Sequence, residues 1–409
     1  MDRAVPTLPS ERIVTLDILR GFALLGILVV NMASFAGRSA FDQPTLFWDQ
    51  AAFFVVDVFF SGKFNSLFSM LFAVGFAIQL ERLEQRAGSQ GLWIYVRRLL
   101  VLFAIGIAHA ILVWSGDVLH MYALLGFALL LVRNVSDRTL LALAAVLLLY
   151  PALRSLALVL FTGPEWTATR LALGREYLAA ANAAFGSGSY ADAVMENWQI
   201  LRRDYLTWMG LERMISLAYV LFLVTMLLGL LAGRHAWIQR AAANVAVVRR
   251  VQWWALGIGI AAGVALAVAN RFVEPAVPSL WSILARLAYG VSRVALMTFY
   301  VATIVRLAQS ARWLPWLMPF AVAGRMPLTN YLLQSVLCTA IFYSWGLGLW
   351  RQMGEALQLG LAFAIFFLLQ VPLSVWWFRH VAYGPMEYLW RLVSYGRRPA
   401  APLAQAAPG

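Results

Sequence analysis

The sequence contains one cysteine, Cys338, one lysine, Lys63, and few charged residues of any kind. A lone cysteine excludes an intramolecular disulfide and a metal centre built from several thiolates. Charged residues make up 12% of the chain, whereas soluble globular chains contain about 25%. The sequence also lacks a Walker-type phosphate loop, a G-x-S-x-G motif and an H-E-x-x-H motif, which excludes the enzyme classes that these motifs mark.

Apolar residues dominate the composition of the chain. They account for 62% of 409 positions, and the mean hydropathy is +0.75. Apolar runs long enough to cross a bilayer, which takes about 20 residues, recur along the whole chain. The sequence therefore predicts an all-α polytopic membrane protein whose surroundings are membrane lipids.

The formal net charge of +13 comes almost entirely from arginines spread over the segments between apolar runs. This distribution is typical of cytoplasmic loops in a membrane protein. A nucleic-acid-binding protein would instead gather its basic residues on one face that follows the phosphates. We therefore expect no nucleic-acid partner.

About ten apolar runs are predicted to span the membrane, within a single integral membrane domain covering residues 1–399. The Ala/Pro-rich residues 400–409 are predicted to be a disordered tail. The predicted spans are residues 16–36, 64–80, 95–114, 118–132, 139–161, 211–232, 251–270, 280–305, 328–349 and 356–378.

The arginines also predict orientation, because basic loops stay in the cytoplasm. Arginines precede the first span and follow the second, so an odd number of crossings separates the first outer loop from the next basic loop. We assign one crossing to residues 64–80 and predict that residues 48–60 form a re-entrant or interfacial segment on the outer side. Continuing this count places both chain ends in the cytoplasm. The arginines that decide it are Arg3, Arg12, Arg82, Arg86, Arg97 and Arg98.

Residues 162–210 form the one long polar stretch between predicted spans and are expected to be extracytoplasmic. Within them, apolar residues recur at intervals of four, three, four and three residues, which predicts an amphipathic helix. We expect this helix to lie on the outer interface as a lid. The residues are Val194, Trp198, Leu201, Tyr205 and Trp208.

Polar residues interrupt the first span. Asp17, Arg20 and Asn31 fall on one stripe of a helix, since Arg20 and Asn31 are about three turns apart. Lipid offers such groups no partner, so the stripe is predicted to face protein or a hydrated cavity. Two interpretations stay open: an ion pair with Asn31 bonding between helices, or the wall of a polar conduit.

Arg286 and Arg293 lie seven residues apart and therefore on one helix face. Arg293 falls near the middle of its span with no acidic residue close by in sequence. Its guanidinium needs an anion, either a carboxylate from another helix or a ligand carboxylate or phosphate.

Further polar candidates lie at or within two other spans. Lys63 either reaches the interface with its ammonium group or captures an anion at a cavity mouth. Arg325 precedes Pro327, which suits the first turn of a helix at the cytoplasmic interface. Asn330 and Gln334 lie four residues apart on that helix and are predicted to face the bundle.

His109, Asp117 and His120 surround the outer turn between two predicted spans. A carboxylate three residues before a histidine can orient its imidazole as a general base. Alternatively, Asp117 caps the helix that follows and His120 is an interfacial histidine. Their spacing matches no familiar zinc motif, so we expect no metal ion.

Five motifs at both ends and in the middle of the chain resemble the YeiB-like bacterial inner-membrane proteins, called domain of unknown function family 418. This resemblance implies a location in the bacterial cytoplasmic membrane. The motifs are RIVTLDILRGFALLGILVVN, KFNSLFSMLFAVGFAIQ, GDVLHMYALLGF, GRMPLTNYLLQS with FYSWGLGL, and YGPMEYLWRLVSYGRRP.

The first helix, with Asp17, Arg20, Gly21 and Asn31, is also similar to that of membrane acyltransferases of the heparan-glucosaminide acetyltransferase type. Those enzymes move an acetyl group from cytosolic acetyl-CoA to an acceptor across the membrane, using a histidine in the segment after this helix. This sequence has no histidine in residues 37–60.

The resemblance implies a membrane acyltransferase with acyl-CoA as co-substrate, no tightly bound cofactor, and a small-molecule or lipid-linked acceptor. The alternative is a carrier of an anionic amphiphile or lipid. We expect His120 and Asp117 to be catalytic. The predicted substrate-binding residues are Asp17, Arg20, Asn31, Lys63, His109, Arg286, Arg293, Arg325, Asn330 and Gln334.

Overall fold

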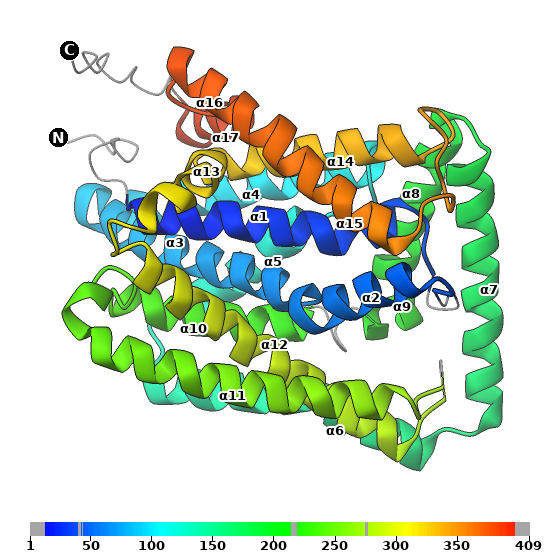
Figure 1. Cartoon of the computed structure of the whole chain (residues 1–409). Helices are drawn as coiled ribbons and strands as arrows, with labels where there is room; N and C mark the ends of the chain where they lie inside the picture. Colours follow the sequence, from blue (N-terminus) through cyan, green and yellow to red (C-terminus); the bar gives the residue numbers. More distant parts are fainter. Residues whose placement is uncertain (1–12, 40–41, 43, 214–218, 275–276, 397–409) are drawn as a thin grey trace.

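The computed structural model describes residues 13–39, 42, 44–213, 219–274 and 277–396. Throughout these ranges the regular structure is helical, and most helices run along one common direction (Figure 1). The predicted tail, residues 400–409, and part of the predicted span 211–232 lie outside the described residues.

Helix α1 (Val14–Phe35) is the central helix of the bundle. It is apolar on nearly all sides and buried along most of its length, as expected for a helix that packs against neighbours all round. Four helices surround it: α3 (Lys63–Ala87), α13 (Leu314–Gly324), α14 (Pro327–Phe342) and α15 (Glu355–Ala364).

Two glycines bring α1 and α13 into direct backbone contact. A Cβ atom added at Gly21 would lie 1.9 Å from the carbonyl oxygen of Phe320, and one added at Gly324 would lie 1.9 Å from that of Asp17. Small residues at such contacts are how membrane helices gain van der Waals packing without a hydrophobic driving force.

A second group of helices packs around α3. The hairpin of α4 and α5 covers one side, and α6, α10, α11 and α12 form a layer on the other (Figure 1). Their bounds are Ser89–Leu112, Leu119–Val132, Asp137–Phe161, Val220–Arg234, Val245–Asn270 and Leu280–Leu307.

The long polar stretch folds into α7 (Pro164–Gly186), α8 (Tyr190–Leu206) and α9 (Trp208–Arg213). A helix over the predicted amphipathic segment is confirmed, whereas α7 was not predicted. Helix α7 crosses one end of the bundle at a steep angle to the other helices (Figure 1). Asn197 of α8 donates to the carbonyl of Ile111 and accepts from the backbone of Ser115, both at 3.2 Å, which fixes α8 on the α4–α5 turn.

The predicted outer segment 48–60 is helical, as α2 (Phe47–Val55) followed by one π-helical turn, η2 (Val56–Phe60). Gly62 then separates this segment from α3 with φ of +77°, a conformation that favours glycine. A Cβ at Gly62 would also lie 2.5 Å from the hydroxyl of Tyr289. Glycine is therefore required at this break for two reasons.

The predicted span 328–349 is helical only as far as Phe342, so the prediction of a helix over residues 343–349 is wrong. Gly348 has φ of +70°, and a Cβ at Gly346 would lie 1.9 Å from the carbonyl of Ala340. These glycines allow residues 343–349 to turn back on α14. Helix α13, which precedes α14, was not among the predicted segments.

Helix α14 begins at a half-buried carboxylate. Glu387 of α17 (Pro385–Tyr395) accepts from the backbone N–H groups of Leu328 and Thr329, at 2.7 and 3.2 Å, and from the Thr329 hydroxyl at 2.6 Å. The first N–H groups of a helix have no partner within it, so Glu387 satisfies them and joins the chain end to the bundle. The last span before it consists of α15, the π-helical η5 (Ile365–Gln370) and α16 (Val371–His380).

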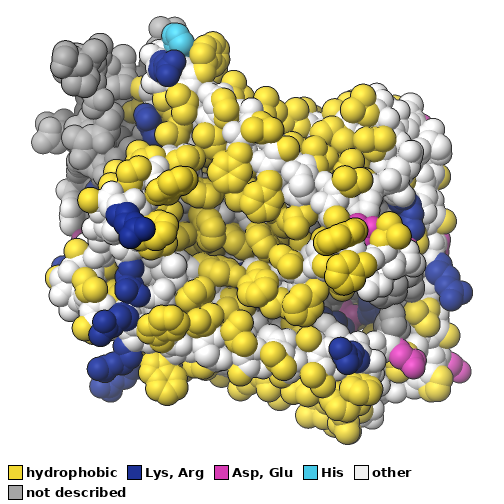
Figure 2. All heavy atoms as spheres, in the orientation of Figure 1, with side chains coloured by type: hydrophobic (Ala, Val, Ile, Leu, Met, Phe, Trp, Pro, Cys, Tyr) yellow, Lys and Arg dark blue, Asp and Glu magenta, His cyan; other side chains and the backbone are white. Residues whose placement is uncertain are grey.

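Seven helical segments of the described residues are long and apolar enough to cross a membrane, which confirms a polytopic membrane protein. Figure 2 shows a broad hydrophobic band across the middle of one face, with Lys and Arg side chains at both ends and more of them at one end. The predicted spans 118–132, 211–232 and 328–349 coincide with the shorter helices α5, α10 and α14, so a total of ten spans stays a prediction. The seven are Val14–Phe35, Phe47–Gln85, Gln90–Leu112, Asp137–Phe161, Ala241–Asn270, Leu280–Leu307 and Glu355–His380.

Gly21→Ala tests the contact between α1 and α13. The added methyl group overlaps the Phe320 carbonyl, so we expect a loss of about 1–3 kcal/mol in the free energy of unfolding. Gly257→Ala on α11 is the control, since a Cβ there meets nothing within 4 Å. Thermal unfolding of the purified protein in detergent compares the two. Equal unfolding temperatures for both variants would contradict the close packing.

Candidate functional site

The buried carboxylate of Asp117 lies at the centre of a polar cluster in the α4–α5 turn. Asp117 is 2% exposed. Its Oδ2 lies 2.7 Å from Nδ1 of His109, in the last turn of α4, and its Oδ1 lies 2.8 Å from Nδ1 of His120, in the first turn of α5. One carboxylate therefore holds two imidazoles.

Local backbone geometry sets this arrangement. Oδ1 of Asp117 also accepts the backbone N–H of His120 at 3.1 Å, so Asp117 caps the first turn of α5 as well as orienting the ring. Gly106 on α4 makes room for it, because a Cβ there would lie 2.3 Å from the His120 backbone nitrogen. Asp117 therefore both caps α5 and bonds to the ring of His120.

The hydrogen bonds of Asp117 indicate which nitrogen of each histidine carries a proton. Burial raises the pKa of Asp117, but hydrogen bonds from His109 and His120 outweigh burial, and the pKa lies below its usual value. An ionised Asp117 accepts from Nδ1–H of each ring, which leaves the lone pair of a neutral imidazole on Nε2. Nε2 of His109 is buried and has no hydrogen-bond partner among the described residues.

A tyrosine from α8 covers the other side of His120. Its hydroxyl, on Tyr205, lies 2.5 Å from Nε2 of His120 and also contacts the hydroxyl of Tyr219, just before α10. Burial and the neighbouring Tyr219 raise the pKa of Tyr205 above its usual range, so Tyr205 is a protonated donor. The sequence analysis placed Tyr205 on the inner face of an amphipathic helix but assigned it no polar contact.

Tyr331 of α14 closes the cluster on a third side. Its hydroxyl accepts the backbone N–H of Val118 at 3.2 Å, and its ring lies 5.6 Å from that of His109. No sequence signal joined Tyr331 to the turn, since 213 residues separate the two.

Two cations lie buried in the bundle near this cluster. Lys63 is 1% exposed and donates from Nζ to the carbonyl of Asp57 at 2.8 Å, so it does not extend to the interface. Arg293 is 4% exposed, donates from Nε to the hydroxyl of Ser66, and stacks over the Phe222 ring at 4.9 Å. Arg286, the other arginine on its helix face, is exposed.

Two residues of the polar stripe on α1 form an ion pair with each other. Nη1 of Arg20 lies 2.9 Å from Oδ1 of Asp17, the i,i+3 pair that the sequence predicted. The Arg20 side chain is 29% exposed, and Asn31 is half-buried. The guanidinium of Arg325, between α13 and α14, lies 3.8 Å from the Phe378 ring centre.

Asn330 and Gln334 face the bundle, as predicted, and bond to other helices. Asn330 donates to the carbonyl of Ala323 at 2.9 Å and to the Ser374 hydroxyl at 3.2 Å. Gln334 donates to Gln370 at 2.8 Å, and Gln370 donates to the Asn330 carbonyl at 2.8 Å. These bonds join α14 to η5 and α16.

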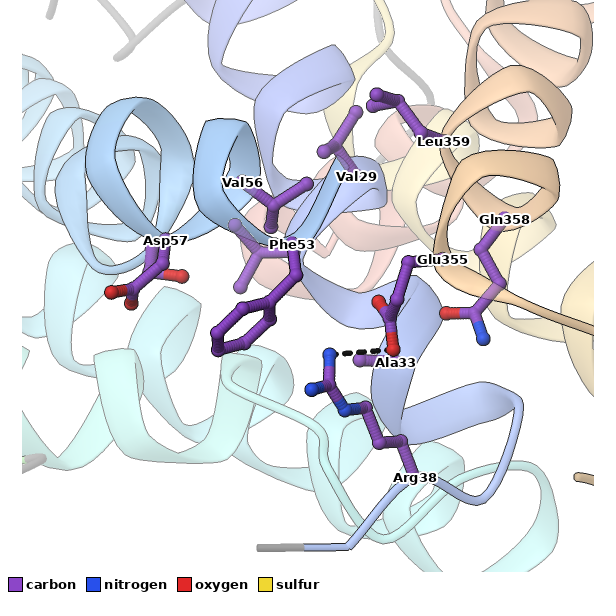
Figure 3. A pocket seen from close by; sticks show the side chains of 11 residues that line it. Val29, Ala33, Arg38, Phe53, Val56, Asp57, Glu355, Gln358 and Leu359 are labelled. Carbon is purple, nitrogen blue, oxygen red and sulfur yellow. Dashed lines mark ion pairs between the residues drawn. The ribbon is translucent and has the colours of Figure 1, made fainter. Parts of the chain in front are cut away.

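A cavity of about 90 Å³ lies between α1, η2 and α15 (Figure 3). Its polar lining includes the Arg38–Glu355 ion pair, Asp57 and Ser61. Its lining includes residues of α1 but none of α12 or α14, the helices that carry Arg293 and Asn330.

Comparison with known proteins decides the family. Residues 232–397 match the sequence model of the family described as "Protein of unknown function (DUF418)". The chain is 33% identical to the uncharacterized protein YxaH of Bacillus subtilis (strain 168) over 97% of both chains. The chain belongs to the DUF418 family. It is also 29% identical to the uncharacterized protein YeiB of Escherichia coli (strain K12), over 93% of this chain and 96% of that protein.

In this DUF418 protein the predicted catalytic pair, Asp117 and His120, is in direct contact, with His109 as a third member. The roles of all these residues, and of the ten predicted substrate-binding residues, stay predictions. Within the described ranges, no group of three histidine, cysteine or acidic side chains is arranged to hold a metal ion.

Asp117→Asn tests whether ionised Asp117 stabilises the DUF418 fold. The folded pKa lies below the unfolded one, so the contribution is complete above about pH 4 and is lost as pH falls through the folded pKa. At pH 7 we expect the variant to be less stable by about 1–3 kcal/mol. Thermal unfolding between pH 7 and pH 3 measures the difference, which should shrink with acid. A difference that stays constant over this range would refute the assignment.

Proposed function

We propose that this DUF418 protein is a membrane acyltransferase that moves an acyl group from cytosolic acyl-CoA to a hydroxyl or amine of an extracytoplasmic or lipid-linked acceptor. The observation that carries the proposal is the Asp117–His120 contact, in which a buried carboxylate holds Nδ1 and leaves Nε2 as a base. In a general base catalyst of this kind, the carboxylate orients the imidazole, and the imidazole accepts the substrate proton.

The proposed reaction uses His120 twice. Nε2 takes the proton of the acceptor while the acceptor oxygen or nitrogen attacks the thioester carbonyl carbon. The carbon–sulfur bond then breaks, and the leaving thiolate takes that proton from His120. Asp117 stays ionised throughout and stabilises the imidazolium that forms between the two steps.

Helix α8 is proposed as a lid over this base. The Tyr205 hydroxyl of α8 is hydrogen-bonded to Nε2 of His120. An acceptor therefore reaches this base only after the Tyr205 hydroxyl moves away. The released hydroxyl is then a donor beside the reacting carbonyl, where negative charge develops. The half-buried position of Tyr205 supports this role, because its side chain reaches the solvent-accessible surface as well as His120.

The proposed orientation places α17 and the start of α1 in the cytoplasm of a bacterial cell, with the protein in the cytoplasmic membrane. Lys and Arg side chains gather at this end of the bundle, as cytoplasmic loops do (Figure 2). Arg20 and Arg325 lie toward the same end, where cations would meet the phosphates of an acyl-CoA. His120 then lies toward the outer end, where the acceptor would bind.

A second candidate function, carriage of an anionic amphiphile, is favoured by the buried cations Lys63 and Arg293. A carrier would use these cations but would have no need of a base. The two functions differ in what they require of His120.

His120→Ala separates the two functions. The purified protein is incubated with labelled acetyl-CoA and cell-envelope acceptors, and transfer of label is measured together with acetyl-CoA binding. For an acyltransferase, loss of the general base should lower turnover by about 10²–10⁴-fold while binding is kept.

His235→Ala is the matched control, because His235 forms an exposed ion pair with Asp137, with Nε2 and Oδ2 2.6 Å apart, and takes no part in the proposed site. Turnover by the control should equal that of wild type. Absence of both transfer and acetyl-CoA binding in the wild-type protein would remove the enzymatic proposal, and full activity of His120→Ala would remove His120 from it.

A further inference from the structure

Lys63 and Arg293 bring two cations into the interior of the bundle from different helices. Lys63 is the first residue of α3, and Arg293 is near the middle of α12. Both are almost fully buried, and they lie within electrostatic range of each other. Two like charges in a medium of low polarity repel strongly unless anions neutralise them.

The protein satisfies these cations only with neutral groups. Lys63 donates to a backbone carbonyl, that of Asp57, and Arg293 donates to a hydroxyl, that of Ser66. Nη2 of Arg293 is buried and has no hydrogen-bond partner among the described residues. Neither cation forms an ion pair with any carboxylate that the structure describes. Within the described ranges, Arg293 therefore keeps one N–H donor group without a hydrogen-bond acceptor.

The local charges do not balance. Asp57 is the carboxylate within electrostatic range of Lys63, and the nearby Arg38 is already paired with Glu355. Neither Lys63 nor Arg293 bonds to a carboxylate oxygen in the described part of the chain, so their positive charges are only partly compensated. Burying an uncompensated charge costs several kcal/mol, and more so away from water in a membrane.

The cavity of Figure 3 adjoins this pair. Asp57 and Ser61 line its wall, and Gly62 and Lys63 follow them directly in the chain. The Cβ position of Gly62 is 3.2 Å from Cδ of Arg293, so the break between η2 and α3 packs directly on the arginine. A ligand in the cavity would therefore contact Arg38 and lie two residues along the chain from Lys63, since Ser61 is part of the wall.

We infer that Lys63 and Arg293 form a binding site for one singly charged oxyanion, such as a phosphodiester. Guanidinium groups donate in a plane that matches two oxygens of such a group, which uses the free Nη2 of Arg293. The anion supplies the missing negative charge. The inference does not depend on acyl transfer, since neither cation is needed as an acid or base.

The test uses the full-length protein and two probes that share this chemistry. Inorganic phosphate is added to the protein in detergent, and phosphatidylglycerol is supplied in nanodiscs that are compared with phosphatidylcholine nanodiscs. Unfolding temperature and bound probe are measured for wild type, Arg293→Gln, Lys63→Met and the control Arg306→Gln. Arg306 lies on the same helix as Arg293 but donates to a side-chain amide, that of Gln252.

We expect a probe to bind wild type and Arg306→Gln and to raise their unfolding temperatures. Binding to Arg293→Gln and Lys63→Met should be weaker by at least about tenfold. A response to phosphatidylglycerol alone assigns the site to a lipid headgroup, and a response to phosphate as well assigns it to the phosphate group itself. Binding of neither probe to wild type, or equal binding to all four proteins, would overturn the inference.

Stability without probe provides a second readout. Lys63→Met keeps the length of the side chain and removes a buried charge, so the variant should unfold at the same or a higher temperature than wild type. A lysine that only holds the fold together would give a lower temperature, which would contradict a ligand site. His120→Ala should bind the probe as wild type does, so loss of acyl transfer and loss of the anion site are told apart.

Discussion

The carboxylate of Asp117 is the contact on which the packing around the α4–α5 turn depends. It caps α5, holds the last turn of α4 through His109, and fixes the ring of His120. Through Tyr205 the same ring reaches α8, and through Tyr219 the start of α10. A buried carboxylate has little water to bond with, so hydrogen bonds within the protein stabilise it. One acidic residue thereby connects the α4–α5 hairpin to two helices that come later in the sequence.

Polar groups in the interior differ in which atoms they leave unbonded. Asn330, Gln334 and Gln370 bond to one another and to backbone carbonyls through their amide N–H groups, while Oδ1 of Asn330 is buried without a partner among the described residues. Arg293 and His109 each keep one buried nitrogen without a hydrogen-bond partner among the same residues. A buried polar atom without a partner costs free energy.

The sequence predicted features that depend on neighbours along the chain. Apolar runs located the main helices, and the i,i+3 spacing placed Asp17 beside Arg20 and Asp117 beside His120. Features that depend on distant residues were missed: Tyr205 lies 85 residues from His120, and nothing in helical periodicity joins them. Of the two interpretations of Lys63, extension to the interface is wrong, since its side chain is almost fully buried after the break at Gly62. The helices α7 and α13 were missed because neither has the length and hydropathy of a span or a clear amphipathic pattern.

In the proposed function, the chemistry takes place at His120, on a substrate that must displace Tyr205. The most direct measurement is an experimental map of the protein in nanodiscs with an unreactive thioether analogue of acyl-CoA. The account predicts that the acyl end of the analogue lies within hydrogen-bonding reach of Nε2 of His120 and that the Tyr205 hydroxyl has left that nitrogen. A saturated complex in which Tyr205 still bonds to His120 and the analogue lies elsewhere would contradict it.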